Sequence, residues 1–161
     1  MKIFYTITLI LFVSLSAFSQ DYMGCNFGVS TAEVKTYFDK MYNRTGEVKN
    51  DVVVYQDFYQ NNGNHSVLFY CNGGTFKNAT VQYLTTTLDA GRLKYSSVLG
   101  SFTKLYGKPS ETEKTSNAEM AGFIKKRGIL AMTCWKISHI RILVFLLKNN
   151  NIWIIHSPIN G

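Results

Sequence analysis

The chain has 161 residues, of which 46% are hydrophobic and 17% are charged. This apolar content excludes an intrinsically disordered chain, and the length fits one domain with its own hydrophobic core. The net charge of +7 is concentrated in the second half: residues 89–161 contain eleven Lys or Arg and four Asp or Glu, against five and six in residues 21–88. A basic half can attract anionic polymers, but it equally keeps a surface soluble.

The first residues have the pattern of a secretory signal peptide. Lys2 provides a positive start, residues 3–18 carry no charge, and Ala17 and Ser19 fit the small-residue positions before a cleavage site. The apolar stretch is shorter than the roughly 20 residues that a membrane span needs. We therefore expect a signal peptide over 1–19, a single domain over 20–161, a periplasmic or secreted location, and no stable membrane span after cleavage.

The first element of the domain is expected to be a helix. Ser30 and Glu33 have the spacing of a capping box, in which each side chain bonds the backbone N–H of the other. An apolar stripe with helical spacing runs from Val34 to Tyr42, and Gly46 is a suitable stop. The helix is expected over residues 31–44.

Three strands are expected after this helix. Residues 52–59 are rich in β-branched and aromatic side chains, residues 66–71 form a short apolar run, and residues 75–84 alternate between two faces. Asn72-Gly73 is a strong signal for a two-residue hairpin between the second and third strands. This region therefore predicts an antiparallel meander.

The second half of the chain has the same order of elements. A helix is expected from Asp89, a suitable N-cap, to the left-handed stop at Gly107. Gly100 inside this helix is a candidate for close packing on a sheet. Residues 118–127 fit either a short helix or a strand. Further strands are expected at residues 129–135, 139–147 and 152–157.

The expected order is α-βββ-α-βββ, which is that of an α+β domain. It predicts an antiparallel sheet of about six strands with two main helices packed on one side. One helix followed by three strands, twice, suggests a tandem αβββ repeat. The strand at 139–147 is apolar on both faces, which is typical of a central strand that is covered on both sides.

Three features resemble small exported bacterial proteins of uncharacterised function. The run Phe-Gly-x-Ser-x-x-Glu-Val from Phe27 to Val34 opens the first helix, Tyr106-Gly-x-Pro109 closes the second, and Trp135 lies on the strand that follows. The first run also resembles the repeat of the superfamily of β-lactamase inhibitor protein and outer-membrane assembly lipoproteins. Members of that superfamily pair short helices with antiparallel strands and bind other proteins. The resemblance implies a shape and a protein-binding role, and it carries no functional residue.

The sequence contains no motif for catalysis or for a cofactor. It lacks a phosphate loop, a dinucleotide fingerprint and a Gly-x-Ser-x-Gly nucleophile motif. We therefore expect a non-enzymatic protein with no cofactor, no metal and no nucleic-acid partner. The alternative is a binder of a small ligand or glycan, or an envelope hydrolase, with a pocket near His139, His156 and Cys134, which belong to neighbouring expected strands.

Three cysteines remain after the signal peptide, namely Cys25, Cys71 and Cys134. An oxidising compartment permits one disulfide and leaves one thiol. Cys71 with Cys134 is a mild preference because both fall in expected strands, and three small buried apolar residues are an equal alternative.

Two groups of side chains are candidates for a binding surface. The first is aromatic (Tyr55, Phe58, Tyr59), and its rings either anchor a partner or pack in the core against the first helix. The second is the dense basic run Lys125, Lys126 and Arg127, which is either a solvated edge or an anion contact. We expect these surfaces to bind another protein of the cell envelope, through the open face of the sheet.

Overall fold

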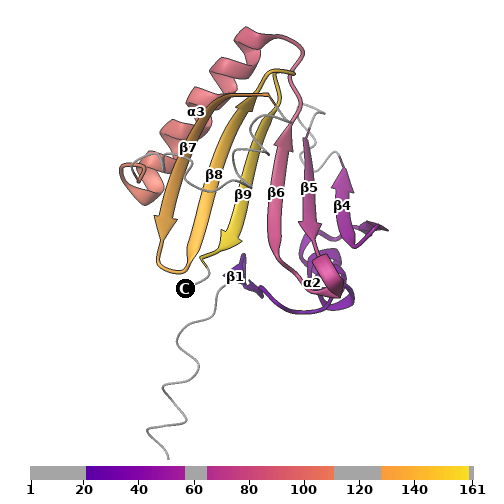
Figure 1. Ribbon diagram of the computed structural model, residues 1–161. Coiled ribbons are helices and arrows are strands. Elements are labelled where there is room, and N and C mark those ends of the chain that lie inside the picture. Colours follow the sequence, from indigo (N-terminus) through magenta and orange to yellow (C-terminus); the bar gives the residue numbers. More distant parts are fainter. Residues whose placement is uncertain (1–20, 57–64, 111–127, 160–161) are drawn as a thin grey trace, which may run out of the picture.

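The computed structural model describes residues 21–56, 65–110 and 128–159. Within these ranges a seven-stranded antiparallel sheet carries two helices, and a separate two-stranded hairpin precedes them (Figure 1). The domain is thus of the predicted α+β class. The expected signal peptide over 1–19 lies outside the described residues, and no helix within them is long and apolar enough to cross a membrane.

The elements follow in chain order as β1 (Asp21–Tyr22), β2 (Cys25–Asn26), α2 (Thr31–Tyr42), β3 (Glu47–Lys49), β4 (Val52–Gln56), β5 (His65–Tyr70), the 3-10 turn η1 (Asn72–Gly74), β6 (Asn78–Tyr83), α3 (Leu88–Tyr106), β7 (Ile129–Ile137), β8 (Ile140–Leu147) and β9 (Ile152–Pro158).

Helix α2 begins where the sequence predicts and ends earlier. The Ser30 hydroxyl accepts the Glu33 N–H at 3.3 Å, and Glu33 Oε2 accepts the Ser30 N–H at 2.9 Å, which completes the capping box. The helix ends at Tyr42, because Asn43 adopts the left-handed conformation with φ 49°. Gly46 is therefore not the stop.

Helix α3 has an N-cap that differs from the expected one. Thr87 caps it instead of Asp89, and the Thr87 hydroxyl accepts the Ala90 N–H at 3.2 Å. Asp89 lies in the first turn, where a carboxylate is favourable to the helix dipole. Gly107 ends the helix with φ 80°, as predicted.

The glycine that allows α3 to pack closely is Gly91 and not Gly100. A Cβ atom on Gly91 would lie 2.7 Å from the carbonyl oxygen of Asn150, in the turn between β8 and β9. A Cβ atom on Gly100 would meet nothing within 4 Å. The expectation for Gly100 was therefore wrong.

The sheet has the order β3-β4-β5-β6-β9-β8-β7. Two meanders meet along β6 and β9 (Figure 1). Along this seam Val81 lies opposite Ile154. Six of these strands correspond to the expected six. The seventh, β3, is a short exposed edge strand that carries two charged residues, Glu47 and Lys49, so no burial pattern marked it in the sequence.

The connection between β5 and β6 is longer than the expected two-residue hairpin. Asn72–Gly74 forms a 3-10 turn, and β6 begins only at Asn78. Thr75 pairs instead with Ser30, the N-cap of α2, in an isolated antiparallel bridge. Thr75 falls within the strand that the alternating pattern predicts, but it pairs with a residue distant in the sequence instead.

Both helices pack on one face of the sheet, which we call the helix face. The rings of Phe38 on α2 and Phe69 on β5 stack with their centroids 4.0 Å apart. On the other half, Tyr95 of α3 and Thr133 of β7 share a hydrogen bond of 2.8 Å. Val81 contacts both apolar clusters, so one core extends beneath the two helices.

The opposite face of the sheet, which we call the second face, carries a separate apolar cluster. Its buried members are Cys134, Leu143, Phe145 and Leu147. Strand β8 is therefore buried on both faces, as its sequence predicts. Two other aromatic residues on this face, Tyr70 and Trp153, are half-buried.

Candidate functional site

A cavity of about 430 Å³ opens on the helix face between α3 and β1. We call it the central pocket. Its size falls in the range of pockets that bind small molecules, which are mostly apolar with a few polar groups. Its lining includes Asp21 and Tyr22 from β1, Val81 and Tyr83 from β6, Phe102 from α3, Ile140 and Ile142 from β8, and Ile154 and His156 from β9.

The register of the central strands determines which side chains form the floor of the central pocket. Ile154 and His156 are two residues apart on β9, so both side chains project to the helix face. Ile154 pairs with Val81 on β6, and His156 pairs with Ile142 on β8. The floor is therefore apolar except for one imidazole.

The imidazole of His156 lies among aromatic rings. The ring centroid of Tyr22 is 4.8 Å away and that of Phe102 is 6.4 Å away. Its Nδ1 atom is buried and has no hydrogen-bond partner among the described residues. Burial lowers the pKa of His156 from 6.5 to about 4, because a charged imidazole would lose its hydration. The side chain is thus neutral near pH 7.

One formal charge lies among the described residues that line the central pocket, that of Asp21. Its Oδ1 accepts the Gly24 N–H at 3.0 Å, which holds the carboxylate beside the tight turn after β1. Lys94 places its ammonium 4.3 Å from the ring centroid of Tyr83. Tyr83 is another lining residue of the pocket.

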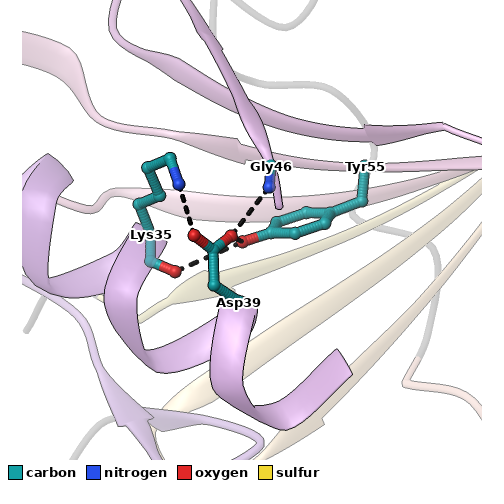
Figure 2. Close-up of polar contacts among 4 residues, drawn as sticks. All are labelled: Lys35, Asp39, Gly46 and Tyr55. Atoms are coloured by element: carbon teal, nitrogen blue, oxygen red, sulfur yellow. Dashed lines mark hydrogen bonds and ion pairs between the residues drawn. The ribbon is translucent and has the colours of Figure 1, made fainter. Parts of the chain in front are cut away.

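Tyr55, a candidate for the binding surface or for the core against the first helix, lies in the core. Its side chain is only 3% exposed. Its hydroxyl donates to Asp39 Oδ1 at 2.7 Å and lies 3.3 Å from the Lys35 carbonyl oxygen (Figure 2). Gly46 is required here, because a Cβ atom would lie 2.5 Å from Tyr55 Cζ. Of the two alternatives for Tyr55, packing in the core against α2 is therefore the one that the structure bears out.

Asp39 is the centre of this polar cluster. Its carboxylate also accepts the Gly46 N–H at 2.7 Å and forms an ion pair with Lys35 (Figure 2). Burial pushes the pKa of Asp39 upward, but the bonds from Lys35, Gly46 and Tyr55 outweigh it and hold the pKa below its usual value. The cluster ties α2 to β4 and is structural.

The other members of the expected binding surface lie outside the described residues. These are Phe58, Tyr59, Lys125, Lys126 and Arg127. The ambiguous segment 118–127 lies there as well.

The trio His139, His156 and Cys134 does not form one site. Cys134 belongs to the apolar cluster of the second face, whereas His156 lines the pocket on the helix face. Their strands, β7 and β9, are separated by β8, and zinc ligands must all lie about 2.0–2.3 Å from one ion. No group of three His, Cys, Asp or Glu within the described ranges could hold a metal ion. Of this trio, His156 is among the described lining residues of the central pocket, and His139 and Cys134 are not.

The preferred disulfide, Cys71 with Cys134, is also excluded. Cys71 belongs to the cluster beneath α2 on the helix face, and Cys134 lies on the second face. Three strands separate β5, which ends just before Cys71, from β7. At about 4.8 Å per strand this is roughly 19 Å, well beyond the 7 Å limit for bridged Cα atoms. All three cysteines are buried free thiols.

The sequence contained one signal for the central pocket. His156 interrupts an otherwise apolar alternation with Ile152 and Ile154 on β9, and a polar residue on a core face is informative. Tyr22 and Phe102 gave no such signal, since their contacts with His156 depend on how β1 and α3 are placed.

These features define an α+β domain with an apolar pocket at the junction of two helix-covered meanders. No protein-family model matches the sequence, and the comparisons with curated proteins and with solved structures found no match.

Proposed function

We propose that this protein is an exported, non-enzymatic binding protein of the bacterial cell envelope, and that it holds a small apolar ligand in the central pocket. The observation that carries this proposal is the 430 Å³ cavity, floored by Val81, Ile142 and Ile154 and containing one neutral imidazole. Apolar walls with few polar groups are typical of small-ligand sites. Export rests on the signal-peptide pattern of residues 1–19.

Binding, rather than catalysis, is favoured by the surroundings of His156. A catalytic histidine is usually oriented by a carboxylate or carbonyl and lies beside a nucleophile. Here the described neighbours of the imidazole are the rings of Tyr22 and Phe102. The side chain therefore shapes a wall of the pocket.

A tandem repeat is a related proposal, and the order of elements supports it. Helix α2 precedes β4, β5 and β6, whereas α3 precedes β7, β8 and β9. The last strand of each unit, β6 or β9, lies at the centre of the sheet. The central pocket then forms where two αβββ units meet.

The binding proposal is tested with N-phenyl-1-naphthylamine, an uncharged dye that fluoresces in apolar surroundings. We expect saturable binding to the purified protein and a loss of at least tenfold in affinity in Ile140→Trp, because the larger ring fills the pocket that Ile140 lines. Leu93→Trp is the matched control, since Leu93 lies on α3 and is 74% exposed. Failure of the dye to bind, or equal binding by both variants, would refute the proposal.

A second function, binding of another envelope protein, is favoured by one surface. Met23, Tyr37 and Met41 expose apolar side chains around α2, and the Tyr37 hydroxyl donates to the Met23 carbonyl at 2.9 Å, which joins the helix to the β1–β2 hairpin. Exposed aromatic residues and methionines are enriched in protein interfaces. Capture of a partner by the wild-type protein and not by Met41→Asp would support this function, and equal capture would contradict it.

A further inference from the structure

Helix α2 exposes a continuous stripe of side chains on the side that is turned away from the sheet. Its buried residues, Val34 and Phe38, lie on the other side. The exposed residues recur in adjacent pairs four residues apart, which keeps them on one side of a helix. We call this stripe the α2 face, and its members are Ala32, Glu33, Thr36, Tyr37, Lys40 and Met41.

The α2 face carries one charge of each sign, and both lie on the line along its centre. Glu33 and Lys40 are seven residues apart, so they differ by only about 20° around the helix axis and by about 10 Å along it. Thr36 and Tyr37 lie between them, one on each side of that line. The two halves of the face are therefore opposite in charge.

This arrangement is complementary to itself. If a second copy of α2 packs antiparallel on the first, across a twofold axis between Thr36 and Tyr37, Glu33 of one copy faces Lys40 of the other. The reverse contact follows from the symmetry, and Thr36 of each copy faces Tyr37 of the other. A parallel pair would instead set Glu33 against Glu33 and Lys40 against Lys40, and such like-charge contacts are unfavourable.

Contacts within the domain hold the central residues of the α2 face in place. Glu33 Oε2 accepts both the N–H and the hydroxyl of Ser30, so the helix cap fixes this carboxylate. The Tyr37 hydroxyl donates to the Met23 carbonyl at 2.9 Å, and its ring packs edge-on against Phe38 with centroids 5.1 Å apart. Side chains that are ordered before binding lower the entropic cost of association.

We propose that the protein associates with a second copy of itself through the α2 face, as an antiparallel, twofold-symmetric pair of helices. The small Ala32 of one copy then faces the long Met41 of the other at the edges of the contact. The inference is independent of the central pocket, and it assigns a second copy, in place of another envelope protein, to the surface around α2. One face of a helix of 12 residues is small beside the roughly 800 Å² per partner of a standard interface, so the association is weak.

Sedimentation equilibrium of the purified protein from about 10 µM to about 1 mM covers the range of a weak dimer. We expect a monomer–dimer equilibrium. Lys40→Glu should weaken dimerisation about tenfold or more, because it sets two pairs of like charges face to face. Lys104→Glu is the matched control. Lys104 is exposed in the last turn of α3, as Lys40 is in α2, so the same change of charge away from the α2 face should leave dimerisation unchanged.

A mixture of two variants tests the twofold geometry. Glu33→Lys alone should also dimerise about tenfold more weakly, because its new ammonium faces Lys40. Mixed with Lys40→Glu, both contacts again join opposite charges, and the two variants should form a heterodimer with an affinity near that of the wild type. Circular dichroism shows whether each variant is folded. Glu33→Gln retains the capping box and removes one charge, so it should weaken dimerisation severalfold without loss of the helix.

Each outcome bears on the inference. A protein that remains monomeric up to about 1 mM overturns it and leaves the surface around α2 to a different protein. Dimerisation that Lys40→Glu does not weaken, or a mixture of folded variants that does not associate, overturns it as well. The dye titration of the central pocket is a separate measurement, so failure of the proposed ligand binding and failure of self-association are distinguishable.

Discussion

The hydroxyl of Tyr55 on β4 donates a hydrogen bond of 2.7 Å to the carboxylate of Asp39 on α2. This contact joins two elements of the first half of the domain. Tyr55, which the sequence makes a candidate for a binding surface, is therefore part of the core. Burial and the Asp39 charge both raise the pKa of Tyr55 above its ordinary value. The hydroxyl therefore stays protonated and remains a donor throughout the neutral range.

Removal of this hydroxyl should weaken the domain. Tyr55→Phe should lower the free energy of unfolding by about 1.5–3 kcal/mol, because it removes a hydrogen bond to a charged group. Urea denaturation measures the change. Tyr37→Phe is the control, since its hydroxyl also donates, to Met23, but on an exposed side chain, and it should cost less than about 1 kcal/mol. Equal losses would contradict the structural role of the Tyr55–Asp39 pair.

The stability of the domain should depend on His156 in mild acid. Its pKa is about 4 in the folded protein against 6.5 in the unfolded chain, so the unfolded state binds the proton first as the pH falls. The stability contributed by the neutral imidazole is complete above pH 6.5 and is lost progressively down to about pH 4.

This pH dependence is measured against a variant that cannot titrate. Between pH 7 and pH 5 the wild type should lose roughly 2 kcal/mol more unfolding free energy than His156→Phe. Other groups titrate equally in both proteins and cancel in the difference. Parallel pH profiles for the two proteins would show that His156 is not buried in its neutral form.

Two glycines of α3 should respond oppositely to alanine. Gly91→Ala places a Cβ atom 2.7 Å from the Asn150 carbonyl oxygen and 3.2 Å from Thr85 Oγ1, and should destabilise the domain by about 1–3 kcal/mol through overpacking. Gly100→Ala meets nothing within 4 Å and should stabilise it by about 0.5–1 kcal/mol through helix propensity. Thermal unfolding followed by circular dichroism gives both signs, and a stabilising Gly91→Ala would contradict the close contact.

Removal of the Ser157 hydroxyl on β9 should stabilise the domain. Its Oγ atom is buried and has no hydrogen-bond partner among the described residues, so Ser157→Ala removes an unsatisfied polar group and should raise the unfolding free energy by about 1 kcal/mol. Ser66→Ala on β5 is the control. Its side chain is half-buried and its hydroxyl is not among the buried unsatisfied atoms, so little change is expected. A destabilised Ser157→Ala would reveal a partner of that hydroxyl.

The native thiols should be unreactive. Cys25 is 5% exposed, and burial raises its pKa to about 11; burial also raises the pKa of Cys71. Thiolate is the reactive form, so alkylation at pH 8 should be slow in the folded protein and fast in guanidinium, as counted by mass spectrometry. Peptide mapping without reductant should find no bond between Cys71 and Cys134, and finding that bond would contradict the sheet order.

The sequence by itself determined the local elements. The Ser30–Glu33 capping box, the stop at Gly107 and the two-sided apolar pattern of β8 depend on neighbours a few residues away, and the structure confirms all three. The prediction from local pattern was wrong where a residue pairs with a distant segment. Thr75 was expected in a strand, but it pairs with Ser30.

Tertiary structure alone decided the candidate site. The pairing of β6 with β9 sets Val81 beside Ile154, and the placement of β1 and α3 sets Tyr22 and Phe102 against His156. The same sheet order puts Cys134 on the face opposite His156. Strand alternation tells which residues share a face of one strand, but which strands become neighbours depends on how the two halves of the chain pack together.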